Sequence, residues 1–298
     1  MPKPTRKSPS AITLCDFQWL GKCFTCGRKG ILSYTIKLFL IAFIALVLSI
    51  GIWLGFIVSH YTVPILMYHY INDEEPLRSK LGVSPKTFDR QMRFLRENGY
   101  NIIPLEELAD LIKNKKKLPS KTVAVTFDDG YLDNYTNVYP VLEKYHIPAT
   151  LFIVINRIGK HLGNDDYMSW QQIKELSRSD LITIGSHSIN HPNLSEIDSE
   201  DKLKYEIIES KRILEEALHR KINLFSYPFG GRSPEARKIV RLAGYKAAVG
   251  TNFPRGSPND DVFALKRLRI SENCKNMFIF WVETAGFYTY IKEQRDDY

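Results

Sequence analysis

Two adjacent aspartates follow a strongly apolar segment in the run Thr126-Phe-Asp-Asp-Gly130. Residues 123–127 are mostly β-branched or aromatic and predict a buried strand. Carboxylates beside buried apolar chain are costly unless something positive holds them. Asp128 and Asp129 therefore predict either a metal site, with one acid as ligand and the other as base, or a pair that caps a helix. Taken alone, the two aspartates do not separate these interpretations.

Two histidines follow a second predicted strand, in the run Ser186-His-Ser-Ile-Asn-His-Pro192. His187 and His191 are four residues apart, so one turn brings both imidazoles to the same side, and Pro192 prevents a longer helix. A lone histidine is usually structural, but this pair at a strand end suits a metal. With Asp129 it predicts a two-histidine, one-carboxylate site for one divalent ion, with zinc the first choice and cobalt, nickel, iron or manganese as alternatives.

Such a site predicts hydrolysis of an amide. A bound metal lowers the pKa of its water from 15.7 to about 7 and polarises a carbonyl group. Asp128 is then the candidate base that accepts the proton of the attacking water. Because an amide anion leaves poorly, the chemistry also needs an acid that protonates the departing amine.

Short apolar strands alternate with helices through most of the chain, which predicts an α/β fold with a mostly parallel sheet. Either an open sheet or a barrel fits this pattern, and both place ligands beyond the carboxyl ends of the strands. The expected strands are 63–68, 123–127, 149–154, 181–185, 224–227 and 246–249. Helices are expected over 85–99, from 130 to about 145, and over 169–178, 199–219 and 234–244.

Residues 38–59 contain no Asp, Glu, Lys or Arg, and about 20 apolar residues suffice to cross a bilayer. Three parts are predicted: a basic cytoplasmic tail (1–37), a transmembrane helix (38–59) and one domain (60–298). The net charge is +8, but the tail holds seven of the 41 basic residues and one of the 33 acidic ones, which leaves 34 and 32. The domain is thus nearly neutral and is not expected to bind nucleic acid.

The basic tail predicts the topology, because Lys and Arg stay on the cytoplasmic side. We expect a single-pass protein of the cell membrane that contacts lipid through 38–59 and carries its domain in the periplasm or outside the cell. A cleaved signal peptide is the alternative, but the basic region and apolar core are too long for one, and no Ala-x-Ala site follows. The sequence indicates no protein partner.

The cysteines predict no disulfide within the domain, since only Cys274 lies there. Cys15, Cys23 and Cys26 are in the tail, where Cys23 and Cys26 resemble half of a zinc ribbon. Three cysteines and no histidine do not complete a four-ligand site in one chain. Unpaired or lipid-modified thiols near the membrane are therefore the favoured interpretation.

The order Thr-Phe-Asp-Asp-Gly, His-Ser-x-x-His-Pro and Tyr-Pro-Phe-Gly resembles the polysaccharide deacetylases, carbohydrate esterase family 4, over roughly residues 62–272. This resemblance implies a distorted (β/α) barrel of about seven strands. It also implies that Asp128 is the catalytic base and that Asp129, His187 and His191 hold the metal.

Two departures from the common family pattern resemble the poly-N-acetylglucosamine deacetylase branch. Ser226 stands where many members have Arg, and no histidine follows His219 to serve as a late acid. In that branch an early Met-Tyr-His supplies the acid, which implies His69 here, with a hydrogen-bonded structural histidine as the alternative. The branch also implies that Arg267 orients the base, with an ordinary surface arginine as the alternative.

The remaining site predictions concern the glycan. The third motif, with Tyr227 and Phe229, is expected to line the substrate cleft, and a backbone N–H near Phe229 is expected to stabilise the oxyanion. Tyr131, Asn134 and Trp170 are further candidates, because aromatic faces suit pyranose rings. Packing behind the Ser169 cap is the alternative for Trp170.

The sequence therefore predicts a membrane-anchored enzyme that removes N-acetyl groups from a polysaccharide containing N-acetylglucosamine, such as peptidoglycan or poly-N-acetylglucosamine. A non-catalytic glycan-binding or scaffold protein on the same fold is the alternative. The complete set of Asp128, Asp129, His187 and His191 argues for the enzyme. A protein that binds a membrane surface or nucleic acid through its basic charge is a third hypothesis, which the neutral domain disfavours.

Overall fold

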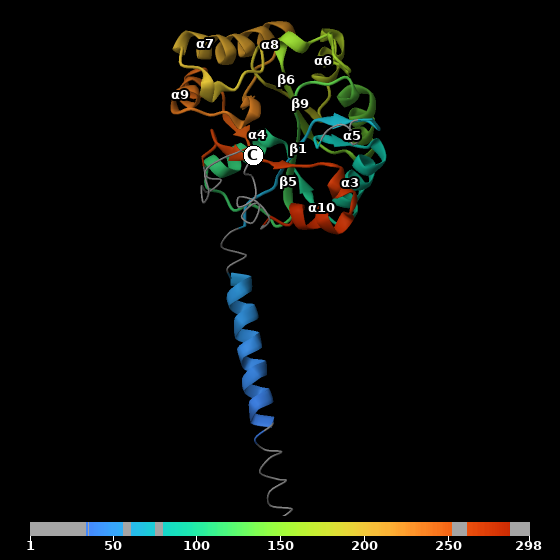
Figure 1. Cartoon of the computed structure of the whole chain (residues 1–298), viewed down its shortest axis with the longest axis vertical. Coiled ribbons are helices and arrows are strands. Elements are labelled where there is room, and N and C mark those ends of the chain that lie inside the picture. The colour runs from blue at the N-terminus through green and yellow to red at the C-terminus, as the bar shows by residue number, and fades with distance from the viewer. Residues whose placement is uncertain (1–33, 35, 56–60, 75–79, 252–260, 287–298) are drawn as a thin grey trace, which may run out of the picture. The chain divides into compact units, whose positions relative to one another are not determined.

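The computed structural model describes residues 34, 36–55, 61–74, 80–251 and 261–286, which fall into two units divided between residues 59 and 60 (Figure 1). The first unit contains the helix Ile36–Gly55, with 20 residues, a mean hydropathy of 2.7 and no buried residue. Its length and composition suit a membrane crossing. Residues 56–59 of the predicted span lie outside the described residues, as do Cys15, Cys23 and Cys26 of the tail.

The second unit is built on a parallel sheet in the order β12-β11-β10-β9-β6-β5-β1-β13, with β4 (Asn101–Ile102) paired to β5. The strands are β1 (Ile65–Tyr68), β5 (Thr122–Phe127), β6 (Ala149–Ile153), β9 (Ile182–Ser186), β10 (Leu224–Ser226), β11 (Ala247–Gly250), β12 (Leu265–Lys266) and β13 (Leu268–Arg269). The two end strands are joined in the chain by Arg267 alone, so the sheet curls into a nearly closed barrel. The predicted barrel is confirmed, with eight strands instead of about seven.

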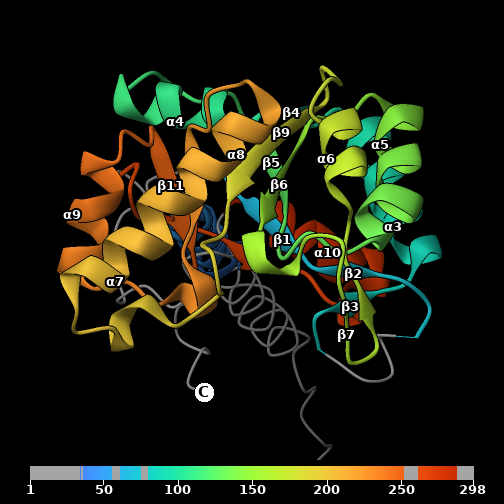
Figure 2. The ribbon, with the colours of Figure 1, turned by 90° about the horizontal axis from the view of Figure 1, so that it is seen from above.

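Helices surround these strands (Figure 2). They are α3 (Pro85–Glu97), α4 (Leu105–Lys113), α5 (Tyr139–Tyr145), α6 (Trp170–Leu176), α7 (Glu200–Lys204), α8 (Ser210–Leu218), α9 (Pro234–Leu242) and α10 (Met277–Thr284). Three of them begin as the sequence predicts, because the hydroxyls of Ser84, Ser169 and Ser233 accept hydrogen bonds from backbone N–H groups of the first turn.

Two of the expected helices are interrupted by π-helical turns. These are η1 (Asn134–Val138), which precedes α5, and η4 (Tyr205–Glu209), which lies between α7 and α8. Hydrophobic periodicity does not reveal a single inserted residue, so the sequence predicted each helix as continuous. The two-residue strands β2 (Tyr70–Ile71), β3 (Gly82–Val83), β7 (His161–Leu162) and β8 (Asp165–Asp166) are likewise too short to show a period.

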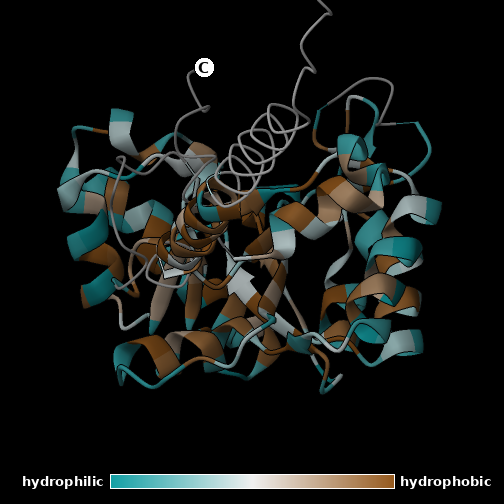
Figure 3. Cartoon of the chain, turned by 90° about the horizontal axis from the view of Figure 1, so that it is seen from below, coloured by the Kyte–Doolittle hydropathy of each residue, from teal (hydrophilic) through white to brown (hydrophobic). Residues whose placement is uncertain are grey.

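Side chains alternate strictly across the barrel wall. In β1, Ile65 packs in a small cluster with Ala124 of β5 and Leu108 of α4, whereas Leu66 and Tyr68 pack in the larger cluster beneath the outer helices. Figure 3 shows apolar strands at the centre and polar stretches on the surrounding helices. Because the period is two, the next inward positions lie just past the strand ends, directly above the small cluster.

Gly185 allows two neighbouring strands to approach inside the barrel. A Cβ at this position would lie 2.5 Å from two ring atoms of Phe152. We expect Gly185→Ala to lower the free energy of unfolding by about 1–3 kcal/mol, because a packed core resists added volume. Urea denaturation of the purified chain in detergent measures this loss. The double variant with Phe152→Leu should lose less than the sum of the two single variants, and a strictly additive double variant would contradict the predicted clash.

Candidate active site

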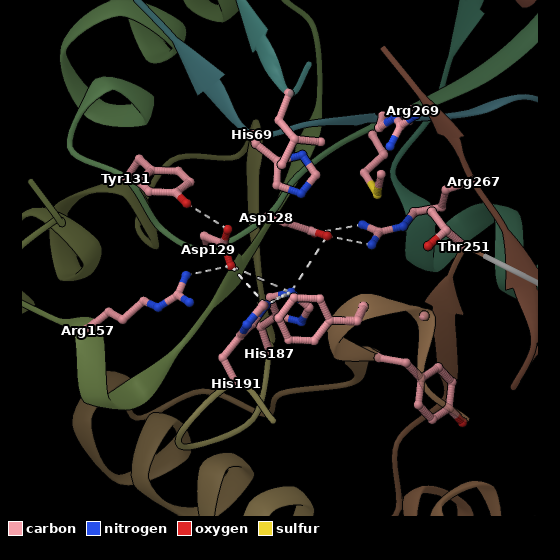
Figure 4. Close-up of a pocket in the computed structure, with 15 residues that line it drawn as sticks. His69, Asp128, Asp129, Tyr131, Arg157, His187, His191, Thr251, Arg267 and Arg269 are labelled. Carbon is pink, nitrogen blue, oxygen red and sulfur yellow. Dashed lines mark hydrogen bonds and ion pairs between the residues drawn. The ribbon is translucent and has the colours of Figure 1, made fainter. Parts of the chain in front are cut away.

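Five inward-facing side chains meet at the carboxyl end of the barrel. His69, Asp128 and His187 each follow the last residue of their strand, Ser226 ends β10, and Arg267 follows β12. Four of them, His69, Asp128, His187 and Arg267, line a pocket of about 480 Å³ (Figure 4), and Ser226 bonds Arg267 from behind it. The pocket thus lies beyond the carboxyl ends of the parallel strands, where such folds place their ligands.

Asp128 and Arg267 form a buried bidentate ion pair. The guanidinium donates from Nη1 to Oδ1 of Asp128 at 2.7 Å and from Nη2 to Oδ2 at 2.5 Å. The same nitrogens reach the hydroxyls of Thr126 at 3.2 Å and Ser226 at 2.9 Å. Burial alone would raise the pKa of Asp128, but Arg267 and then His187 hold it well below its ordinary value. The carboxylate is therefore ionised at neutral pH.

The three predicted metal ligands form a small triangle. His191 Nε2 lies 3.2 Å from His187 Nε2 and 3.2 Å from Asp129 Oδ1, and His187 Nε2 lies 3.8 Å from the same oxygen. One point lies about 2 Å from all three atoms, which matches the usual zinc–nitrogen and zinc–oxygen lengths of about 2.0–2.2 Å. The predicted ligands are thus brought together, although their role stays a prediction.

The surroundings of the three candidate ligands leave a lone pair on each ligand atom free to face the centre of the triangle. His187 Nδ1 donates to the carbonyl oxygen of Ser226 at 2.8 Å, which fixes the tautomer whose Nε2 can bind a metal. Burial and then the neighbouring His187 lower the pKa of His191 to about 3, so its imidazole is neutral. Asp129 Oδ1 is buried, yet it accepts no hydrogen bond from any residue that the structure describes. Arg157 Nη1 lies 2.9 Å away as an ion pair without hydrogen-bond alignment. This donor set fits a divalent cation.

A buried glutamate holds the histidine loop. Glu206 is 6% exposed and accepts from the backbone N–H groups of Ile189 and Asn190 at 2.9 Å each, and from Asn190 Nδ2 at 2.6 Å. Ser188 Oγ accepts from the N–H of His191 at 2.9 Å. Glu206 lies in the π-helical turn η4, and such turns often occur at functional sites.

Half of the described non-glycine residues with positive φ lie at the pocket or in the histidine loop. Asp129, Ser188, His191 and Phe229 have positive φ values of 72°, 68°, 61° and 55°. These left-handed conformations cost non-glycine residues roughly 1–3 kcal/mol each and persist only where the surroundings enforce them. Their clustering indicates that side-chain direction at this site is maintained at the expense of local backbone energy.

His69, the predicted acid, points into the pocket on the same side as Asp128 (Figure 4). Its Nδ1 has no hydrogen-bond partner among the described residues, and its backbone carbonyl accepts from Asn134 Nδ2 at 3.1 Å. Burial lowers the pKa of His69, while the nearby carboxylates of Asp128 and Asp129 act in the opposite direction. The ring is placed for proton transfer, and the acid role stays a prediction.

The predicted glycan-binding residues are placed unequally. Phe229 is 63% exposed, lines the pocket, and makes a T-shaped contact with the His191 ring at 4.6 Å between centroids. Tyr227 also lines the pocket, but its hydroxyl donates to the carbonyl of Phe263. Tyr131 lines the pocket with its hydroxyl committed to Asp129, and Asn134 is buried against His69.

Trp170 is not among the residues that line this pocket. It packs instead against the larger hydrophobic cluster at the start of α6, as the alternative interpretation proposed. A glycan contact at Trp170 has no support from this geometry. The Ser169 capping box explains its position, because the cap directs the first turn of α6 onto the barrel wall.

Sequence reasoning missed Arg157 and Glu206, and it missed the structural role of Ser226. Arg157 ends the 3-10 turn Ile155–Arg157 after β6, so the strand-end rule could have suggested it. Glu206 gave no such signal, since an acidic residue in an amphipathic helix is ordinary. Ser226 was identified only as a departure from the family pattern, yet its hydroxyl and carbonyl contact Arg267 and His187.

Comparison with known proteins agrees with this fold. A family model described as polysaccharide deacetylase matches residues 115–248. The chain is 35% identical to the Bacillus subtilis (strain 168) protein YxkH over 209 residues, which is 70% of this chain and 71% of that protein. It is 27% identical to the poly-beta-1,6-N-acetyl-D-glucosamine N-deacetylase of Staphylococcus aureus (strain MRSA252) over 200 residues, 64% of this chain and 69% of the relative.

Two solved structures are also similar. The Streptococcus pyogenes deacetylase PplD, in complex with acetate, superposes with a TM-score of 0.65 at 30% identity and covers 73% of this chain and 97% of its own. IcaB from Ammonifex degensii gives a TM-score of 0.63 at 26% identity and covers 75% and 97%. The barrel and its site define a hydrolase of the deacetylase class. The chain belongs to the polysaccharide deacetylase family.

We expect Glu206→Gln to weaken metal binding about 10–100-fold, because residues that support ligands contribute on that scale. The amide nitrogen of glutamine would face N–H groups of Ile189 or Asn190 that now donate hydrogen bonds to the carboxylate. The loop that bears His191 would therefore lose its anchor. Isothermal titration with zinc measures the affinity. Glu216→Gln on the exposed face of the same helical region is the matched control, and equal affinities for both variants would reject the anchoring role.

Proposed function

We propose that this chain is a metal-dependent N-deacetylase, anchored in the cell membrane through residues 38–59, that acts outside the cytoplasm on a polysaccharide containing N-acetylglucosamine. Poly-N-acetylglucosamine and peptidoglycan are the candidate substrates, and similarity to the Staphylococcus aureus enzyme favours the first. Residues 60–298 would be the catalytic domain, and residues 1–37 the cytoplasmic tail.

One observation carries the proposal: three potential ligand atoms converge beside an ionised carboxylate, that of Asp128, which lies outside their triangle. Asp128 Oδ2 lies 3.7 Å from His187 Nε2. The carboxylate that pairs with Arg267 thus lies next to the ligand triangle but is not part of it. A protein that only binds glycan would need neither this triangle nor the bidentate Arg267. The arrangement therefore favours catalysis over a scaffold function.

In the proposed mechanism, Asp129, His187 and His191 would hold a divalent ion, which would polarise the acetamide carbonyl and make water more acidic. Asp128 would accept the proton of the attacking water, and Arg267, which binds both carboxylate oxygens, would fix the orientation of Asp128. Because that pairing also makes Asp128 a weak base, the proton it receives must come from an acidified water. Phe229 borders the substrate and would offer its backbone N–H to the oxyanion.

The central test measures acetate release from poly-N-acetylglucosamine and from peptidoglycan by the full-length protein. We expect release with added zinc or cobalt, loss with a chelator, and restoration by metal. Asp128→Asn should reduce the rate by about 10²–10⁴-fold, because it removes the base and keeps the shape. Unchanged release in Asp128→Asn or in chelator would sink the proposal, whereas zinc binding without acetate release from either glycan would favour the glycan-binding alternative.

His69 can be tested through the leaving group. We expect His69→Ala to lose about 10²–10⁴-fold in kcat/KM on an N-acetylated glycan, since an amine must be protonated as it departs. On an aryl acetate ester the loss should be much smaller, because a phenolate leaves without a proton. Equal losses on both substrates would show that His69 does not act as the acid. Asp128→Asn, which is expected to lose activity on both, is the control.

A further inference from the structure

The hydroxyl of Tyr131 is directed at the metal-ligand candidate Asp129. Tyr131 Oη lies 2.9 Å from Asp129 Oδ2 and 2.7 Å from Tyr70 Oη, and Tyr70 Oη lies 3.1 Å from Asp165 Oδ2. An aspartate carboxylate has no hydrogen to donate at neutral pH, so Asp129 only accepts. The single hydrogen of Tyr131 therefore goes to Asp129, which turns the opposite oxygen, Oδ1, toward the histidines.

The Tyr131 ring is held between two other tyrosines. Its centroid lies 3.9 Å from that of Tyr70 and 4.9 Å from that of Tyr167, and both pairs are inclined by 29°. Backbone hydrogen bonds fix the same layer, from the N–H of Leu132 to Asp166 at 2.8 Å and from the N–H of Met168 to Gly130 at 3.0 Å. Tyr131 is 5% exposed. Its hydroxyl is thus rigidly placed rather than available to a sugar.

Arg157 approaches the other oxygen of the same carboxylate. Its Nη1 lies 2.9 Å from Asp129 Oδ1, and its guanidinium lies 5.4 Å from the Tyr167 ring centroid (Figure 4). The preceding N–H groups of Ile155 and Asn156 donate to the carbonyls of Ser188 and Ile189 at 3.2 and 2.9 Å. Arg157 is therefore attached to the histidine loop, with a full positive charge at the oxygen that faces the ligand triangle.

We propose that Tyr131 and Arg157 are positioning residues that set the metal affinity of Asp129 in opposite directions. Tyr131 strengthens binding by holding Oδ2, so that Oδ1 needs no reorientation. Arg157 weakens binding, because like charges that share one oxygen repel each other in a partly buried site. The inference rests on the proposed metal dependence, and it names residues outside the predicted ligand set.

Zinc affinity of the metal-free, full-length protein is measured in detergent by competition with a chromophoric chelator. The tail cysteines can bind zinc themselves, so Asp129→Ala supplies the baseline to be subtracted. We expect Tyr131→Phe to bind zinc about 10–100-fold more weakly, and Arg157→Gln to bind it roughly tenfold more tightly. Tyr131→Phe keeps the stacked ring, so only the hydrogen bond is removed.

Two matched variants separate positioning from folding. Tyr135→Phe removes an exposed hydroxyl that bonds Glu175, so its zinc affinity should equal that of the parent. Tyr70→Phe keeps the Tyr131–Asp129 bond and should change affinity less than Tyr131→Phe does. Thermal midpoints of the metal-free proteins show whether each variant is folded. These midpoints should differ far less than the zinc affinities.

The inference is overturned if Tyr131→Phe retains the parent affinity or if Arg157→Gln binds zinc more weakly than the parent. If the parent protein still binds zinc and releases acetate, either of these results leaves the proposed function intact. A parent that binds no more zinc than Asp129→Ala overturns the proposed metal dependence and this inference together. Opposite shifts in the two variants support it.

Discussion

The bidentate pair between Arg267 and Asp128 joins the closure of the barrel to the chemistry of its pocket. Arg267 is the single residue between β12 and β13, its N–H donates to Gly250 at 3.0 Å, and the N–H of Ile270 donates to Met67 at 2.9 Å. Two buried charges are costly unless their geometry is good and their remaining hydrogen-bonding groups are satisfied. The hydroxyls of Thr126 and Ser226 accept the further hydrogen bonds of Arg267. The last strands therefore close the sheet and at the same time place a counter-charge beside the buried Asp128.

Much of the candidate site could be predicted because its candidate ligands lie in two short runs that follow strands. Asp128 with Asp129, and His187 with His191, owe their positions to local geometry, so residue type and spacing were enough. Arg267 and His69 depended on the family resemblance, because neither shows locally what it contacts. The short strands β12 and β13 and the helix α10 were missed, since two residues or an apolar helix without polar alternation give no periodic signal.

What the sequence could not predict is mainly support from remote segments. Glu206 reaches the histidine loop from a π-helical turn, and Arg157 reaches Asp129 from the turn after β6. Tyr70 acts at one remove, because its hydroxyl contacts that of Tyr131, which bonds Asp129. Each contact depends on tertiary placement rather than on spacing. Trp170 is the opposite case, since an aromatic residue that suits a sugar is here part of the packing. These outer contacts also enforce the positive φ of Asp129 and His191, which local preference alone would not maintain.

The closure of the barrel by β12, Arg267 and β13 also determines when the pocket is complete during synthesis. Asp128 and Arg267 are 139 residues apart, which corresponds to roughly 7–28 s of translation at about 5–20 residues per second. A nascent chain that already contains both histidines still lacks the guanidinium, and Asp128 is left without its counter-charge. Partial chains therefore carry every candidate ligand but no oriented base, so hydrolytic capacity arrives only with the final strands.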